Sequence, residues 1–169
     1  STEVLEGKNK RTSVEGNGSA AEICREVGIA FGLKLLWGLP GDTPGSLQGN
    51  VAFIKRYNSY DQLRTIRFVT PYPGSPLYYL AIEEGMLEGP GDFLDIFTNS
   101  DRITVNFTDL DTDTCHRFLF VANRDLIHDH QKHTDMTITE AERIIEDFRS
   151  LYFEKDVSFR GARHYEAET

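Results

Sequence analysis

Residues Leu33 to Thr43, with the sequence Leu-Lys-Leu-Leu-Trp-Gly-Leu-Pro-Gly-Asp-Thr, decide how this chain is expected to fold. A short apolar run stops at Gly38, and Pro40 and Gly41 then favour a tight turn. Thr43 and Pro44 next supply an N-cap and a first helical residue. The stretch therefore predicts a strand over residues 29–37, a tight loop and a helix.

The glycines of this loop allow two interpretations. Backbone N–H groups near Gly38 and Gly41 can come close to a ligand, and the N-terminus of the following helix favours negative charge. In parallel α/β folds, ligands bind at this carboxyl end of the strands. Alternatively, the loop is an ordinary strand-to-helix turn in which the glycines only satisfy the backbone geometry. These residues alone favour neither interpretation.

The same order of elements occurs a second time. Residues 64–70 predict a strand that breaks at Pro71, and Ser75-Pro76 opens a helix that Gly85 ends. Strands that alternate with helices predict parallel pairing and a right-handed crossover. Since two strands alone make a poor sheet, further strands are expected from sequence outside these residues or from another chain.

Helical spacing of apolar residues extends the helix that begins at Pro44 to about residue 58, and it predicts three further helices, at about residues 12–27, 113–128 and 139–152. Capping boxes are expected where Thr12 meets Glu15 and where Thr139 meets Glu142, and a short extended piece is expected at 103–107. A frayed tail is expected over 159–169. The side chains expected to be buried in these helices are Ala20, Ile23, Cys24, Val27, Leu47, Val51, Ile54, Phe118, Leu119, Ala122, Leu126, Ala141, Ile144, Ile145, Phe148, Leu151 and Tyr152.

Length and composition narrow the class of protein. The chain has 169 residues, which suits one domain or one compact piece of a larger one. Its net charge of −9 argues against a general nucleic-acid surface. No apolar run is long enough to span a membrane and no signal peptide is visible, so a cytoplasmic location is expected. Because the first residue is Ser1 rather than Met, the chain is interpreted as a fragment or a processed chain.

Metal-binding and catalytic patterns are weak. Cys24 and Cys115 lie far apart, which excludes a disulfide scaffold and a cysteine-dense metal motif, and Cys24 is interpreted as an inert core residue. His128, His130 and His133 are interpreted as surface histidines because no carboxylate completes a defined ligand set. The aspartates at 109, 111 and 113 lack the Gly and Glu of a calcium loop and are interpreted as an acidic turn. No catalytic residue and no metal ligand is therefore assigned.

A set of motifs nevertheless occurs in an order that resembles a known family. The set consists of Ser1-Thr-Glu-Val-Leu5, Lys10-Arg-Thr12, Cys24-Arg-Glu-Val-Gly-Ile29, Gly38-Leu-Pro-Gly-Asp-Thr43, Thr70-Pro-Tyr-Pro-Gly-Ser-Pro-Leu77 and Glu84-Gly-Met-Leu87. Together these motifs resemble the carboxyl half of the core of radical S-adenosylmethionine (radical SAM) enzymes. The resemblance is closest to the branch that often carries a cobalamin-binding domain and to methylthiotransferase-like relatives, and it covers about residues 1–90.

The resemblance implies an α/β fold. Residues 1–91 would form the carboxyl-terminal part of a partial (β/α)6 barrel with parallel strands, and residues 92–169 a mainly helical extension. It also implies contacts to S-adenosylmethionine from the loop after the first strand, from apolar side chains near adenine, and from the end of the second strand. Ser1 resembles the last serine of a Gly-x-Glu-Ser-Gly-Ser stretch that contacts the ribose and methionine part. The implied cofactor-binding residues are Ser1, Leu36, Gly38, Leu39, Pro40, Gly41, Asp42, Val69, Thr70 and Pro71.

One part of the family's machinery is missing from these residues. Radical SAM enzymes hold a four-iron four-sulfur cluster through a Cys-x-x-x-Cys-x-x-Cys loop, and neither Cys24 nor Cys115 belongs to such a loop. The chain is therefore expected to contribute adenosine contacts and part of a substrate cavity, without activity by itself, and to need the missing half or a partner chain. The alternative is a non-catalytic binding or scaffold module that uses an open sheet edge for a partner or a homodimer.

Overall fold

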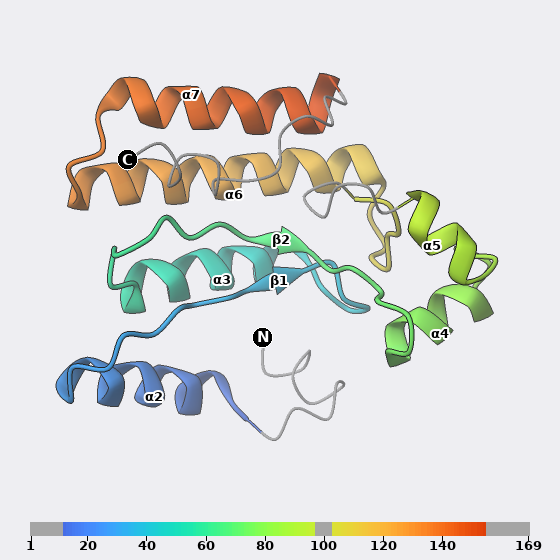
Figure 1. The fold of residues 1–169 in the computed structure, drawn as a ribbon, viewed down its shortest axis with the longest axis horizontal. Coiled ribbons are helices and arrows are strands. Elements are labelled where there is room, and N and C mark those ends of the chain that lie inside the picture. The colour runs from blue at the N-terminus through green and yellow to red at the C-terminus, as the bar shows by residue number, and fades with distance from the viewer. Residues whose placement is uncertain (1–11, 97–102, 155–169) are drawn as a thin grey trace.

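A computed structural model describes residues 12–96 and 103–154 of the chain. The elements follow one another as helix, strand, helix, strand and then helices (Figure 1). Their bounds are α2 Val14–Glu26, β1 Leu36–Trp37, α3 Pro44–Tyr57, β2 Arg67–Phe68, α4 Pro76–Glu83, α5 Pro90–Ile96, α6 Thr112–His133, α7 Ile138–Arg149 and the π-helix η1 Ser150–Glu154. The expectations for Ser1, for residues 1–5 and for the tail 159–169 lie outside the described residues.

The two strands pair in parallel, as expected. Leu36 lies opposite Arg67 and Trp37 lies opposite Phe68. The Val69 N–H donates to the Trp37 carbonyl at 2.8 Å, which continues the ladder by one hydrogen bond. Both strands run toward α4, so the two glycine-proline turns that follow them start at the same edge of the sheet (Figure 1).

The partial (β/α)6 barrel is wrong for the described residues. The chain is mostly helical, and its sheet has two strands of two residues each. Residues 29–35 precede β1 without strand pairing, because β2 is the only neighbour that β1 has in this part of the chain. The strands expected at 29–37 and 64–70 are reduced to Leu36–Trp37 and Arg67–Phe68, because a ladder needs hydrogen-bond partners along its whole length.

Helix α6 closes the outer edge of β2 (Figure 1). The Asn123 side chain is fully buried, and its Oδ1 accepts from the Ile66 N–H at 2.8 Å. Its Nδ2 donates to the Ile66 carbonyl at 3.0 Å and lies 3.3 Å from the Tyr152 hydroxyl. One amide side chain thus takes the place that a third strand would occupy, and it satisfies backbone groups that are costly to bury unpaired.

The helix starts follow the capping rules, with small shifts from the expected positions. Thr43 and Ser75 cap α3 and α4 as expected, and Thr43 forms a capping box with Ser46. The first capping box is wrong, because Ser13 rather than Thr12 caps α2. The last one lies two residues earlier than expected, between Thr137 and Glu140. Thr12 and Ser13 are adjacent, and Thr137 and Thr139 are two residues apart, so the sequence pattern does not select between the two candidates at either place.

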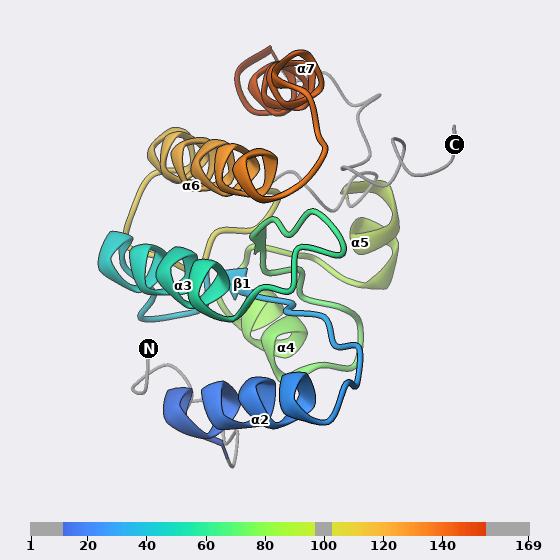
Figure 2. The same cartoon turned by 90° about the vertical axis from the view of Figure 1, so that its left-hand side faces the viewer.

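A single hydrophobic core joins the sheet to the helices on either side of it (Figure 2). The expected core residues of α3 and α7 are confirmed at Leu47, Ile54 and Phe148, whereas Phe118 on α6 is partly exposed. The expected face of α2 is wrong, because Ile23 and Val27 are 58% and 62% exposed. The opposite side packs inward instead: Gly18 lies so close to the Tyr57 ring that a Cβ at Gly18 would overlap it.

The region between α4 and α6 differs most from expectation. Helix α5 was not anticipated, and residues 103–107 form no strand. Ile103, Val105 and Phe107 are buried, with partly buried residues between them, but the backbone bends at residues 104 and 105. Helix α6 continues five residues past the expected end, to His133. Among the described residues, no helix has the length and apolar character needed to cross a membrane.

Candidate functional site

The first candidate site is the turn after β1, which we call the Gly38 corner and define as residues 38–42. Gly38 has φ +97° and Gly41 has φ +84°, values that favour glycine. A Cβ on Gly38 would overlap the Phe68 ring, so the corner and the end of β2 are in direct contact. Trp37 anchors the corner from the other side, because its indole Nε1 donates to the Thr43 carbonyl at 3.0 Å.

The Asp42 side chain occupies the backbone donors of the Gly38 corner. Its Oδ2 accepts from the N–H groups of Gly38 at 3.0 Å and Leu39 at 2.9 Å. Its Oδ1 accepts from the Ser46 hydroxyl at 2.6 Å. The carboxylate is 8% exposed, so these bonds form in a largely desolvated place. Of the two glycines whose N–H groups were expected near a ligand, Gly38 therefore donates to a carboxylate of the chain itself, and the neighbouring Leu39 does so too.

The remaining expected cofactor residues divide into exposed and buried groups. Leu36 is half-exposed, Gly41 is exposed, and Leu39, Pro40 and Thr70 are partly buried. Val69 and Pro71 are buried, and the Val69 N–H is already bonded to Trp37. The structure thus brings the two expected turns together, but it leaves mainly apolar side chains for contact with a ligand. Such a surface suits a flat uncharged ring better than a phosphate.

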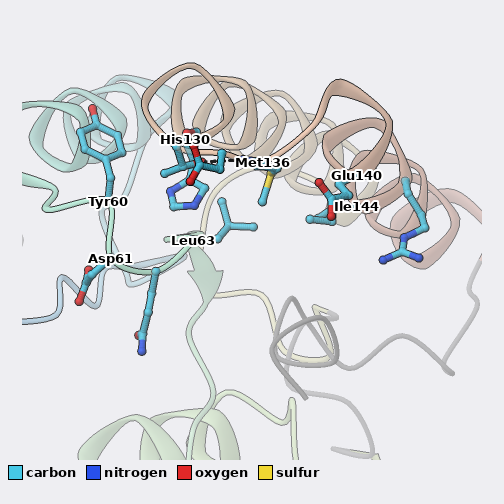
Figure 3. A pocket seen from close by; sticks show the side chains of 11 residues that line it. Tyr60, Asp61, Leu63, His130, Met136, Glu140 and Ile144 are labelled. Atoms are coloured by element: carbon cyan, nitrogen blue, oxygen red, sulfur yellow. Dashed lines mark hydrogen bonds between the residues drawn. The ribbon is translucent and has the colours of Figure 1, made fainter. Parts of the chain in front are cut away.

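The second candidate site is a pocket of about 430 Å³ that the sequence did not reveal, and we call it the His130 pocket. It lies between the segment before β2, the carboxyl end of α6 and the first turns of α7 (Figure 3). Its lining residues are Tyr60, Asp61, Gln62, Leu63, His130, Thr134, Asp135, Met136, Glu140, Arg143 and Ile144. Because residues 60–63 precede β2, the pocket lies near the opposite end of the sheet from the Gly38 corner.

His130 is the buried polar group of this pocket. The side chain is only 7% exposed, and its Nδ1 has no hydrogen-bond partner among the described residues. Burial lowers the pKa of the His130 imidazole, and the charges of Arg64 and His133 lower it further, whereas Asp129 and Asp61 oppose the shift. The imidazole is therefore neutral at pH 7, with one ring nitrogen as donor and the other as acceptor.

Tyr60 is held in an unusual conformation at the edge of the His130 pocket. It is the one residue other than glycine with a positive φ in the described ranges, at +60°. Its ring stacks on His133 with centroids 4.3 Å apart, and its hydroxyl donates to Asp129 Oδ2 at 3.0 Å. Burial and the Asp129 carboxylate both raise the pKa of Tyr60. Backbone strain of this kind persists where the surroundings fix it and is concentrated at functional sites.

The histidines do not form a metal centre in the part of the chain that the structure describes. No group of three or more His, Cys, Asp or Glu side chains is placed there to hold a metal ion. His133 Nδ1 donates to the Asp129 carbonyl at 2.7 Å, and His128 faces Glu142. The interpretation of all three as surface histidines is wrong for His130, which is buried.

The two cysteines are free, and neither is placed for catalysis. Cys115 is buried, and burial raises the pKa of its thiol, which makes it a poor nucleophile. Cys24 is half-buried on α2, so it lies at the border of the core rather than inside it.

A signal for the buried position of His130 was present in the sequence. His130 lies four residues after Leu126 and three after Ile127, which places it on the buried face of an uninterrupted helix. Because the helix was expected to end at residue 128, His130 was not counted among the residues on its buried face. The other walls of the pocket come from segments about 70 residues apart, which no local pattern connects.

Comparison of the chain with protein-family models, curated proteins and solved structures finds no match.

Proposed function

We propose that this chain is part of a radical SAM enzyme and that its two glycine-proline turns contact the adenosine part of S-adenosylmethionine. The four-iron four-sulfur cluster would be held by a segment or a partner chain outside these 169 residues, because the sequence has no Cys-x-x-x-Cys-x-x-Cys loop. A cytoplasmic location is part of this proposal, in keeping with two unpaired cysteines.

The observation that carries the proposal is the contact between the two turns. Gly38 packs against Phe68, and the Val69 N–H bonds to Trp37, so the ordered motifs at 38–43 and 70–77 begin side by side. The strands are parallel, which places both turns at the carboxyl edge where α/β proteins bind ligands. The ordered motif set is the reason to propose S-adenosylmethionine as the ligand, and the closeness of the two turns supports a shared contact surface.

The chemistry of the Gly38 corner supports adenine contact over anion contact. The N–H groups of Gly38 and Leu39 already donate to Asp42, so a phosphate or carboxylate ligand could bind them only by displacing this buried carboxylate. The Leu36 side chain is 50% exposed beside the corner and offers apolar surface. Covering such a side chain with an aromatic ring is favourable because it removes apolar area from water.

Binding of S-adenosylhomocysteine to the isolated chain tests the proposal. In nitrogen-15-labelled protein, we expect saturable shifts at the backbone amides of Gly38, Gly41 and Thr70. Leu36→Ala should weaken this binding roughly tenfold, because it removes apolar contact area without opening the core. Ile138→Ala is the matched control, since Ile138 is 70% exposed at the start of α7.

Two outcomes would contradict the proposal. One is the absence of any saturable shift at the corner amides; the other is an equal loss of binding in the Leu36 and Ile138 variants. A separate measurement addresses the missing cluster: after reconstitution with iron and sulfide, the chain alone should form no 5′-deoxyadenosine. Stoichiometric cluster together with cleavage of S-adenosylmethionine would show that the chain does not need an outside cluster loop.

A second candidate function is a non-catalytic scaffold module that pairs through a sheet edge. The observation in its favour is that α6 closes only the β2 edge. In a parallel strand, the backbone N–H and C=O groups of successive residues point to opposite edges. The Trp37 backbone bonds to β2, so the backbone groups of Leu36 point to the outer edge of β1. There the Asn50 side chain donates to the Leu36 carbonyl at 3.2 Å. Sedimentation equilibrium tests this candidate: Asn50→Ala should strengthen association through β1, and a monomer at all concentrations in both proteins would remove it.

A further inference from the structure

We propose that the His130 pocket binds a small organic ammonium ion with a short alkyl chain, such as a diamine. This site is separate from the adenosine contacts proposed above, because it lies at the amino end of β2 and shares no lining residue with the Gly38 corner. Three features of the pocket support this proposal: its charged side chains, the buried imidazole of His130 and the apolar side chains beside them.

The charged side chains of the pocket favour a cation. Three carboxylates line it, from Asp61, Asp135 and Glu140, together with the guanidinium of Arg143. Arg64 is ion-paired with Asp61 at 3.1 Å, so the carboxylates exceed the guanidinium groups by one. Asp61 accepts from Ser59 and from Arg64, and Glu140 accepts from Thr137, so both carboxylates are held in fixed positions as anions. An anionic ligand would meet these carboxylates, whereas an ammonium group gains attraction from each of them.

His130 supplies the specific hydrogen bond that the walls lack. A neutral imidazole has an acceptor nitrogen, and an ammonium group has three N–H donors to offer. His130 Nδ1 is buried without a partner in the described part of the chain and has almost no accessible surface. A ligand would bond to it after the ring turns toward the pocket, and this bond would satisfy an unsatisfied polar group. Figure 3 shows the imidazole between the side chains of Tyr60 and Leu63.

The remaining walls suit an alkyl chain that carries the charge. Leu63, Met136 and Ile144 provide apolar surface beside the carboxylates, and Tyr60 provides an aromatic ring that attracts cations. The pocket volume of about 430 Å³ is large enough for a short alkyl chain. Because the pocket is open to solvent, its shape alone cannot select one ligand over another. A bare metal ion fits less well, because the pocket has no cluster of ligating side chains in the described residues.

Titration of the labelled chain with 1,4-diaminobutane tests this proposal, with 1,4-butanediol as a neutral ligand of the same length. We expect the diamine to give saturable shifts at the amides of Gln62, Thr134 and Asp135, and the diol to give none. Equal shifts from both ligands, or no saturation with the diamine, would overturn the proposal.

Charge variants separate binding in the pocket from general attraction to an acidic protein. Glu140→Gln removes one charge from the wall and keeps the helix start, since glutamine also serves in a capping box. It should weaken diamine binding about twofold to fivefold, as expected for an exposed ion pair. Glu142→Gln changes the same charge on the same helix outside the lining and should leave binding unchanged. Equal weakening by both variants would overturn the proposal.

His130→Leu tests the hydrogen bond. It should weaken diamine binding by more than Glu140→Gln does, because the bond to the buried ring is lost. Circular dichroism would verify that the variant is folded. A folded His130→Leu protein with wild-type affinity for the diamine would overturn the role of the imidazole.

Discussion

The Gly38 corner and the His130 pocket lie at opposite ends of the same two-stranded sheet. The polar groups of the corner are hydrogen-bonded within the corner, whereas the buried imidazole of the pocket lacks a partner at Nδ1 among the described residues. In the corner, Asp42 bonds to Gly38, Leu39 and Ser46, so every partner lies within four residues. In the pocket, the lining comes from distant segments and His130 Nδ1 stays unpaired among the described residues. The comparison teaches that a loop with the sequence features of an anion site can be closed by its own carboxylate. A pocket without such features can keep a polar group open.

The largest expected effect comes from Gly38→Ala, which breaks the closed corner. The new Cβ would overlap the Phe68 ring, and φ +97° is costly for any residue with a side chain. We expect the free energy of unfolding to fall by about 3 kcal/mol or more, from the backbone cost and the displaced ring together. Urea denaturation followed by Trp37 fluorescence measures this loss. Gly49→Ala on α3, where a Cβ meets open space, is the control and should not destabilise the protein.

Asp42→Ala should have the next largest effect, because it leaves two buried backbone donors without an acceptor. We expect a loss of about 2–3 kcal/mol in the free energy of unfolding, as for hydrogen bonds to a charged group. The same denaturation experiment applies, with Asp113→Ala on the exposed first turn of α6 as a control of equal charge. If the Asp42 variant were as stable as this control, the corner would not depend on its internal carboxylate.

A smaller effect is expected when pH is lowered, because the free energy of unfolding then depends on the protonation of His130. The pKa of His130 is lowered in the folded protein from its ordinary 6.5, so below pH 6.5 the unfolded chain takes up the proton first. The free energy of unfolding should therefore fall as pH decreases from 6.5 toward the lowered pKa of the folded state. The carboxylates with lowered pKa values, such as Asp61 and Glu140, act only below about pH 4.5, which separates the two windows. Denaturation of the wild type and of His130→Leu at pH 7.5 and 5.5 measures the difference; equal pH dependence in both would show that His130 is not its source.

The smallest expected effect on stability is that of His130→Leu at neutral pH. Because the imidazole nitrogen has no partner in the described residues, its replacement by an apolar side chain of similar size should change the free energy of unfolding by less than about 1 kcal/mol. A loss as large as that of Asp42→Ala would mean that His130 is bonded in solution, and the contrast between the two sites would disappear.

Local patterns predicted most of the helices and both turns, whereas the contacts between distant segments were missed. Thr43-Pro44 and Ser75-Pro76 gave correct helix starts, because capping depends on residues three apart in sequence. The face of α2 was wrong, because Gly18 packs on Tyr57 and no periodicity shows that a glycine will be a contact point. The Gly38 corner was found as a turn, but its closure by Asp42 was not foreseen.

The barrel interpretation was wrong for a reason that is also tertiary. Strand-forming residues at 29–37 and 64–70 are compatible with a long sheet, but the extent of a sheet depends on which groups meet its edges. Here Asn123, more than fifty residues after β2 in the chain, bonds to Ile66 and closes that edge.

The sequence by itself determined where this chain turns and where most of its helices begin, since these properties depend on dihedral preferences and on neighbours a few residues away. The alternation of strands and helices also predicted that the two strands run in parallel. Only the tertiary structure decided which donors are already bonded, which edge of the sheet is closed and which histidine is buried. Hydrogen-bond satisfaction and burial depend on groups that are far apart in the sequence and meet only in the folded chain. A local sequence pattern therefore cannot predict them.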